Sequence, residues 1–465
     1  MSFQTSSGDE FRQSNRLYRA VWRWHFYAGL FVAPFLLMLA TTGLIILWVT
    51  AISPEYGDWL RVKAAGEALR PSAQVEAALA AHPGSSAGKY ISPWGSDYPA
   101  IVRIDLPEGN RVLAINPYDG AVLRDTAEGD TWNDFITDIH GTLLISGDNG
   151  IGDWLIEIAA SLAIIVVITG LYLWFPRDRR GIASALLPQL GLRGRALWRS
   201  LHQSVGIWIS VILLFFVLSG LSWTGVWGSK IVQAWSTFPA EKWDNVPLSD
   251  SAHASMNHGA VKEVPWTLEQ TLLPESGSNA GIEGLPPGIP ANVDSIVALG
   301  RAIGLQGRFQ VAYPGDDKGV WTISQDSMSY DSNSPTGDRT VHIDQFTGKI
   351  LADVKFADYP LGGKAMAVGI ALHEGQLGWW NVVLNALYCL AVIFACISGI
   401  VMWWKRRPAS EFGSPRYARG YRVPTGALIA GAILAVLFPL GGIAILTFAI
   451  IDFLLPNRLK QAGAA

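Results

Sequence analysis

Two histidines in this 465-residue chain begin the same short motif. His25 is followed by Gly29 and His202 by Gly206, each four residues further on and inside apolar sequence. Imidazole nitrogens ligate haem iron and also relay protons. Because a polar ring in lipid needs partners for its nitrogens, these histidines are candidates for binding a cofactor.

Each motif continues with a hydroxyl residue and a glycine, at Thr42-Gly43 and at Ser219-Gly220. Eighteen residues make five helical turns of about 27 Å, so His25 shares a helical face with Gly43, and His202 with Gly220. Glycine on the face that carries an imidazole allows a flat, bulky group or another helix to approach closely. Identical spacing in two distant segments is unlikely to arise by chance.

Two further histidines, His140 and His373, precede the next apolar segments and are each followed by glycine. Those apolar segments also match, as Thr169-Gly170-Leu171 and Ser398-Gly399-Ile400. The chain is therefore predicted to be built twice. The two copies cover about residues 20–177 and 197–406.

Long stretches without Lys, Arg, Asp or Glu must position these histidines. Five such stretches occur, at residues 24–54, 158–176, 200–229, 375–404 and 423–451. Each can cross a bilayer, since about 20 apolar residues suffice. The last contains Phe438-Pro439, which predicts either one kinked span or a re-entrant hairpin.

The composition fits a membrane protein and argues against other classes. Only 16% of the residues are charged, against roughly 25% in an average soluble domain. A net charge of -3 gives no basic surplus for binding nucleic acid. The two cysteines, Cys389 and Cys396, are seven residues apart in an apolar run, too far along a helix to form a disulfide.

Arginine-rich patches predict the orientation of the spans. They lie at residues 12–23, 177–199 and 405–422. Positive residues face the cytoplasm, so the two long segments between the spans are expected on the outer side. This gives the following layout: cytoplasmic N-terminus 1–23, span 24–50, outer module 51–150, span 151–176, loop 177–200, span 201–228, outer module 229–374 with an insertion at 236–290, span 375–404, basic loop 405–422 and a kinked span or hairpin 423–455.

The two outer segments resemble each other. Residues 115–123 and 343–351 both have the pattern of strand, turn, strand, and Gly120 and Gly348 would supply the positive φ of a tight hairpin. A helix is expected before each hairpin, at 72–81 and 293–303. The predicted fold is thus an internally duplicated α-helical membrane bundle of about five spans with two periplasmic α+β modules, whose insertion, rich in Pro, Gly and Ser, is expected to be irregular.

Haem is the partner that best suits four histidines at span ends. Two imidazoles from facing helices saturate haem iron and leave an electron-transfer site. His25 and His202 both begin outward-going spans, which places one haem near the cytoplasmic face. His140 and His373 both precede inward-going spans, which places a second haem near the outer face. Pairing the histidines within each copy, instead of across the two copies, also gives two histidines for each of two haems.

Two other interpretations of these histidines remain open. Any one of them is as well explained by the polar interface at a span end, although four at duplicated positions weaken that explanation. A proton or metal path is the second alternative. It is weakened by the scarcity of carboxylates in the spans, since Glu157 only flanks its span.

The other four histidines are expected to have no role with a cofactor. His253 and His258 fall in a loop and are expected to be solvated rather than to bind iron. His82 lies at a helix end and His342 in a strand, and both are expected to be structural or incidental.

The histidine and glycine spacing, the outer hairpins and the Phe-Pro-Leu-Gly-Gly segment at 438–442 resemble the PepSY-associated transmembrane proteins. Within that group the chain is similar to inner-membrane ferric-siderophore reductases, over about residues 16 to 458. The resemblance implies a bacterial inner-membrane protein with periplasmic PepSY-like modules and non-covalent b-type haem. One departure is Pro117-Tyr118-Asp119 in the first hairpin, where the second has Gln345-Phe346-Thr347.

These observations lead to a functional prediction. We expect a haem-dependent electron-transfer protein with two b-type haems that reduces a ferric siderophore, or another ferric chelate, in the periplasm. No Gly-x-Gly-x-x-Gly fingerprint encodes a flavin or nicotinamide site, so electrons would come from membrane quinol or a separate cytoplasmic reductase. The alternatives are a non-enzymatic regulatory or binding protein of the membrane and an iron or siderophore permease.

Overall fold

A computed structural model describes residues 6–51, 60–145, 150–176, 181–257, 263–332, 334–407 and 425–454. The chain divides into two compact units. We call residues 1–44, 139–231 and 384–465 the helical unit, and residues 45–138 and 232–383 the sheet unit. His258 and parts of two arginine-rich patches, at 177–180 and 408–424, lie outside the described residues.

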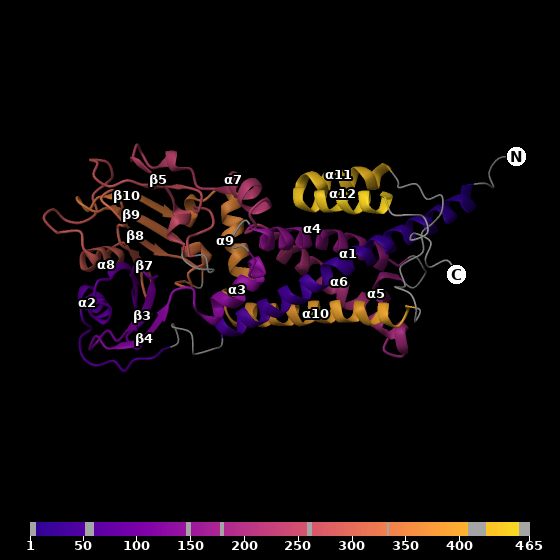
Figure 1. Cartoon of the computed structure of the whole chain (residues 1–465), viewed down its shortest axis with the longest axis horizontal. Helices are drawn as coiled ribbons and strands as arrows, with labels where there is room; N and C mark the ends of the chain where they lie inside the picture. Colours follow the sequence, from indigo (N-terminus) through magenta and orange to yellow (C-terminus); the bar gives the residue numbers. More distant parts are fainter. Residues whose placement is uncertain are drawn as a thin grey trace. The chain divides into compact units, whose positions relative to one another are not determined.

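Four helices are long and apolar enough to cross a membrane in the described part of the chain. They are α1 (Ser6–Ala51), α4 (Ile151–Trp174), α6 (Gly194–Leu221) and α10 (Trp379–Trp404) (Figure 1). In α1 the apolar portion is Leu17–Ala51. Each exceeds the roughly 20 residues that a bilayer requires, so the chain is a membrane protein.

The helical unit is held together by apolar packing between these helices. Phe216 of α6 stacks on Tyr388 of α10, with ring centroids 4.3 Å apart. Alanine and other small residues of α4, among them Ala160 and Ala163, are buried in the same core. Small side chains let helix backbones approach closely, which is how helices associate in lipid.

The C-terminal apolar segment forms two shorter helices instead of a fifth long span. α11 (Thr425–Leu437) ends before Pro439, and α12 (Pro439–Leu454) packs beside it (Figure 1). A Cβ at Gly442 would lie 2.7 Å from the Cβ of Ala435, so glycine is needed for this close approach. The sequence predicts about five spans; the described residues contain four candidates and this helical hairpin.

The sheet unit contains one antiparallel sheet of eight strands in the order β10-β9-β8-β7-β1-β2-β3-β4 (Figure 1). The first four strands are β1 (Ser86–Ile91), β2 (Ala100–Asp105), β3 (Arg111–Ile115) and β4 (Val122–Ala127). The other four are β7 (Gln310–Ala312), β8 (Val320–Gln325), β9 (Arg339–Asp344) and β10 (Ile350–Lys355).

The two predicted modules share this sheet. Strands β1 and β7 pair antiparallel, with Tyr90 opposite Val311, and so join the two halves edge to edge. This pairing protects an edge that each half would otherwise expose. The expectation of two separate modules is therefore corrected to a single sheet with four strands from each half.

Local sequence explains the repeated elements of the two halves. α2 (Pro71–Ala81) and α8 (Val293–Ala302) agree with the predicted helices and contribute to the same core. Gly120 and Gly348 have φ of 75° and 68°, as a tight turn requires. Asp344 fixes the second turn, because its Oδ1 accepts hydrogen bonds from the backbone of residues 346 and 347.

The insertion at 236–290 is more ordered than its composition suggests. It contains a two-stranded sheet, β5 (Leu248–Ala252) and β6 (Leu272–Pro274), and short helical turns. Phe238, Trp243 and Leu268 pack with residues of β8 and β10 in a buried cluster. Apolar side chains in a Pro-rich and Gly-rich segment thus supply a second core for the unit.

Two more helices, α3 and α9, each precede a candidate span in the chain. α3 (Trp132–Thr142) follows the first half of the sheet, and its last residues, from Ile139, belong to the helical unit. α9 (Leu361–Glu374) follows the second half and ends at Gly375, which adopts a left-handed conformation. His140 lies in α3 and His373 in α9.

Candidate functional site

His25 is held by a hydroxyl of a neighbouring span. Its Nδ1 lies 3.0 Å from Oγ1 of Thr169 on α4. The same hydroxyl donates its only proton to the carbonyl oxygen of Ile165, at 2.6 Å. Because a hydroxyl has a single hydrogen to donate, this arrangement leaves its oxygen to accept from His25 and favours the tautomer with the ring proton on Nδ1.

His202 has the same arrangement on α10. Its Nδ1 lies 2.9 Å from Oγ of Ser398 and 3.1 Å from the carbonyl oxygen of Ala395. A carbonyl oxygen can only accept, so Nδ1 is again the donor. Ser398 also donates to Ala395, at 2.9 Å, as Thr169 does to Ile165.

His140 repeats the pattern a third time, against α1. Its Nδ1 lies 2.8 Å from Oγ1 of Thr42, which donates to the carbonyl oxygen of Met38 at 2.9 Å. The three histidines therefore have the same tautomer, protonated at Nδ1. Their Nε2 atoms keep a lone pair and make no hydrogen bond with any described residue.

This tautomer is the one that a metal-binding histidine adopts. A ligating imidazole usually donates from its second nitrogen to an oxygen, which fixes the ring and raises the basicity of the ligating nitrogen. The hydroxyls of Thr169, Ser398 and Thr42 supply that oxygen. The chemistry of the three donor sets thus fits axial ligation of haem iron through Nε2.

A glycine follows each of the three hydroxyl residues and lies against the imidazole. A Cβ at Gly170 would be 3.2 Å from Cε1 of His25, one at Gly43 would be 3.6 Å from Cε1 of His140, and one at Gly399 would be 3.8 Å from Cε1 of His202. Each hydroxyl-glycine pair therefore contacts two adjacent atoms of the ring, Nδ1 and Cε1. In the sequence these hydroxyl-glycine pairs are recognised as repeated motifs. Their contact with the histidines is seen only in the structure.

The predicted glycines next to the first two histidines lie in open surroundings. A Cβ at Gly29 or at Gly206 would meet no described atom within 4 Å beyond its own stretch of helix. A flat group can therefore approach the backbone one turn from His25 and from His202. Gly220, the fourth predicted glycine, lies in the last turn of α6.

His25 and His202 lie close enough for their charges to interact. Both are half-buried, near the beginnings of α1's apolar portion and of α6. The pairing of these two histidines across the two copies, which the orientation argument favours, stays a prediction. Their neighbours Thr169 and Ser398 lie near the ends of α4 and α10, as antiparallel packing of adjacent spans requires.

The other predicted pair is divided between the two units. His140 belongs to the helical unit, whereas His373 belongs to the sheet unit, where it is half-buried. Their pairing stays a prediction from the sequence. In the described residues no group of three or more His, Cys, Asp or Glu side chains could hold a metal ion directly. Haem with two histidine ligands does not need such a group.

Two buried carboxylates of α4 were missed by the sequence interpretation. Glu157 is fully buried rather than merely flanking its span, and Asp153 is 6% exposed. Asp153 accepts from the backbone of Gly225 at 2.9 Å, and Glu157 accepts from Val226 and Trp227 at 3.1 Å each. They satisfy the free N–H groups before the short π-helix η2 (Trp227–Val232). Carboxylates are thus present within a span, which removes one argument against a proton path.

His253 and His342 form a buried pair in the sheet unit, which corrects the expectation that His253 is solvated. Their Nε2 atoms are 2.8 Å apart. His253 Nδ1 donates to the carbonyl oxygen of Thr271 at 2.7 Å, so its Nε2 accepts from His342. His342 Nδ1 then accepts from Thr322, at 2.9 Å. Burial lowers the pKa of His253 to about 4 and lowers that of His342 well below its usual value.

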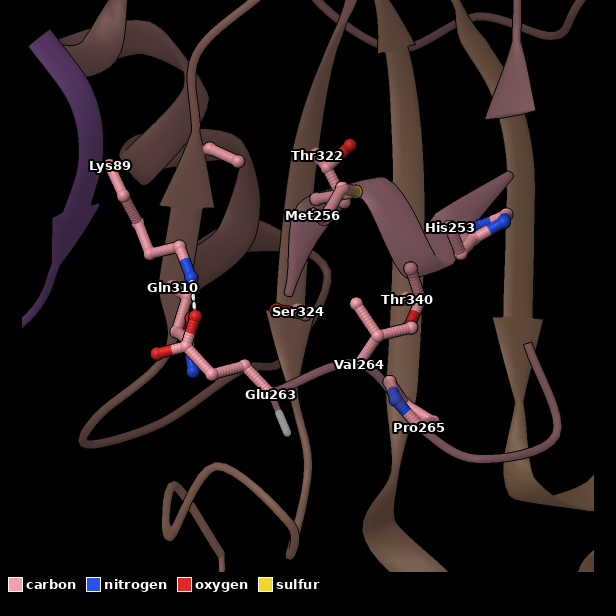
Figure 2. A pocket seen from close by; sticks show the side chains of 11 residues that line it. Lys89, His253, Met256, Glu263, Val264, Pro265, Gln310, Thr322, Ser324 and Thr340 are labelled. Atoms are coloured by element: carbon pink, nitrogen blue, oxygen red, sulfur yellow. Dashed lines mark hydrogen bonds and ion pairs between the residues drawn. The ribbon is translucent and has the colours of Figure 1, made fainter. Parts of the chain in front are cut away.

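A small pocket adjoins this pair (Figure 2). Its volume of about 20 Å³ suits a water molecule rather than a substrate. Figure 2 shows Lys89 and Glu263 pointing toward one another at its other side, where they form an ion pair. Since every polar nitrogen of the histidine pair is satisfied by the protein, this site is structural.

Comparison with known protein families gives a match. The family model described as the PepSY-associated TM region matches residues 22–406. That range includes all four candidate histidines. No curated protein matches the chain.

Proposed function

Because the chain belongs to the family of the PepSY-associated TM region, we propose that it is a membrane electron-transfer protein that binds b-type haem between His25 and His202. The family accounts for a membrane protein, but not for a cofactor. The proposal of haem rests on the geometry of the histidines.

The hydrogen bonding of Nδ1 in His25 and His202 is the observation that carries the proposal. Each Nδ1 proton is committed to a hydroxyl oxygen whose own proton is committed to a carbonyl. Each Nε2 therefore presents a lone pair without any change of protonation. Two such nitrogens near one another saturate haem iron, which favours electron transfer over oxygen binding.

The residues of the helical unit have separate roles in this site. Thr169 and Ser398 orient the rings, and Gly170 and Gly399 allow the helices to close on them. Bound haem would supply one-electron chemistry over a range of potentials that its surroundings set. Gly29 and Gly206 leave room for the porphyrin plane beside the backbone.

We further propose that the electrons reduce a ferric chelate on the outer, periplasmic side of the bacterial inner membrane. A second haem on His140 and His373 is part of this proposal and rests on the sequence. Ferric iron is a hard ion that oxygen donors bind tightly. One added electron gives ferrous iron, which those donors hold less well, so reduction releases the metal. The donor of electrons is membrane quinol or a cytoplasmic reductase.

The test is the haem content and redox behaviour of the purified full-length protein. We expect a Soret band, split α and β bands after dithionite, and reoxidation when a ferric siderophore is added. His25→Ala and His202→Ala should each lose the same haem, whereas His82→Ala, which changes a histidine paired with Asp125, should not. A colourless protein after expression with haem supplementation would refute the proposal and favour a binding or regulatory role.

A further inference from the structure

Two arginines of the helical unit lie near one another, where α6 begins and α10 ends. Arg195 is in the first turn of α6, and Arg406 follows the end of α10 by two residues. Burial lowers the pKa of the Arg406 guanidinium, and the nearby cation of Arg195 lowers it further. Folding therefore brings two positive charges together, an arrangement that an anion between them would stabilise.

The first candidate span, α1, contributes aromatic rings to the same place. The guanidinium carbon of Arg406 lies 4.7 Å from a ring centroid of Trp22 and 5.1 Å from that of Phe26. Phe26 directly follows His25 in α1. Arg406 is therefore held beside the turn of α1 that carries one proposed haem ligand.

Arg195 has a comparable relationship to the other proposed ligand. It precedes His202 by seven residues in α6, which is almost two full turns. The two residues therefore share a helical face, about 10 Å apart along the axis. Since Arg195 is exposed, its guanidinium is open to a ligand on that face.

Haem has charged groups that require such surroundings. Its two propionates are carboxylates, and ionised groups are costly within the hydrocarbon of a bilayer. Residues 25–54 and 202–229 contain no Lys, Arg, Asp or Glu. A haem held between His25 and His202 therefore finds charged partners for its propionates on the side of the two arginines, where the apolar sequence ends.

We propose that Arg195 and Arg406 bind the propionates of the haem between His25 and His202. The inference rests on the proposed function and adds to it the orientation of the porphyrin, with its carboxylates toward the start of α6 and the end of α10. Arginine suits this role, because its planar guanidinium donates two parallel hydrogen bonds to a carboxylate.

The same two cations influence the redox potential of the haem. Reduction from ferric to ferrous adds one negative charge to the haem, and nearby positive charges favour that change. Loss of either guanidinium should therefore lower the midpoint potential. A role in folding alone would reduce stability or haem content without shifting the potential in this direction.

Binding is tested by loading the haem-free full chain, in detergent, with haem b or with its dimethyl ester, in which both propionates are uncharged. A His140→Ala background restricts the measurement to the haem of His25 and His202. We expect this chain to bind haem b at least about tenfold more tightly than the ester, because the ester loses its charge-assisted hydrogen bonds. Arg195→Gln should reduce this ratio, and adding Arg406→Gln should bring it close to one.

The matched control is Arg193→Gln, which removes another exposed arginine directly before α6. It should keep the ratio of the two affinities. Redox titration of the chain with His140 intact gives a second measurement, on the haem that His25→Ala removes. Its midpoint potential should fall in Arg195→Gln and in Arg406→Gln but not in Arg193→Gln. Arg406→Lys keeps the charge without the planar fork, so it should retain most of the potential while binding haem b less tightly.

Equal affinity for haem b and its ester in the chain with both arginines would overturn this inference while leaving haem binding intact. Failure to bind either porphyrin would instead refute the proposed function on which it rests. The arginines could also serve lipid phosphate. In that case the arginine variants would lose affinity for phosphatidylglycerol vesicles relative to phosphatidylcholine vesicles but keep the porphyrin ratio and the potential, and the inference would be wrong.

Discussion

Oγ1 of Thr169 accepts a hydrogen bond of 3.0 Å from Nδ1 of His25. The two residues are 144 positions apart in the chain and lie on different candidate spans. Ser398 and His202 have the equivalent relationship, as do Thr42 and His140. A hydroxyl residue followed by glycine thus positions a histidine at three places in the helical unit.

Replacing Thr169 by valine should weaken haem binding at His25. Valine has nearly the same shape but no oxygen, so the Nδ1 proton would lose its acceptor and the ring its orientation. Partners of this kind contribute roughly 10- to 100-fold to metal affinity. Haem per polypeptide and the midpoint potential of the remaining haem measure the effect.

The matched control for this change is Thr447→Val in α12. Thr447 makes the same hydroxyl bond to a carbonyl one turn earlier, at 2.8 Å from Ile443, but its side chain is exposed. Haem content and potential should equal those of the wild type. If Thr169→Val also has the haem midpoint potential of the wild type, the hydroxyl of Thr169 has no role in orienting a ligand.

Gly170→Ala should displace the imidazole of His25. The added Cβ would be 3.2 Å from Cε1, closer than most carbon contacts, so the ring must move. Alanine favours a helix over glycine by roughly 0.5–1 kcal/mol, so lower helix stability cannot explain a loss. We expect a shifted electron paramagnetic resonance signal of the ferric haem and lower occupancy.

Gly431→Ala in α11 serves as the comparison, because a Cβ there would meet no described atom within 4 Å. It should leave the spectrum as in the wild type. The idea that glycine is needed for ring packing fails if Gly170→Ala also retains the wild-type signal and full haem.

Part of this architecture follows from sequence and part depends on packing. Hydropathy finds the four long helices, and the spacing of His25, His202, Thr169 and Ser398 marks them as related. Spacing does not show that a hydroxyl of one span meets a histidine of another, since that depends on which helical faces pack together. The sharing of one sheet through β1 and β7 is hidden for the same reason.

Two polar residues were misjudged because their partners are distant in the chain. His253 lies 89 residues from His342, and the two meet only because the insertion packs on the sheet. Glu157 looks like a flanking residue until the turn at 225–227 supplies N–H groups to it. A local window of sequence contains no sign of either contact.

The buried pair of His253 and His342 should make the sheet unit less stable as the pH falls. Burial lowers the pKa of both imidazoles, that of His253 to about 4, whereas an unfolded histidine titrates near 6.5. Between these values the unfolded chain binds more protons, so stability is full above about pH 6.5 and declines as the pH falls toward 4. The slope is at most about 1.4 kcal/mol per pH unit for each histidine.

This contribution can be isolated with a variant, because other groups titrate in the opposite sense. Burial raises the pKa of Asp326 and of Asp338 to about 7, which favours the folded state at lower pH. The difference in unfolding free energy between the wild type and His342→Phe should therefore shrink as the pH falls from 7 to 5. A constant difference for His342→Phe would mean that the pair is already protonated or is not buried.

Glu157→Ala should destabilise the helical unit by roughly 1–3 kcal/mol, the cost of leaving buried donors without acceptors. The N–H groups of Val226 and Trp227 would lose their only described acceptor, at the point where the chain turns into η2. Glu157→Gln keeps one carbonyl oxygen in the same place, so it should recover most of the stability. Thermal unfolding in detergent, followed by near-ultraviolet circular dichroism, gives both values. If the glutamine variant unfolds as early as the alanine variant, the negative charge is what the site requires, and Glu157 has a role beyond holding this turn.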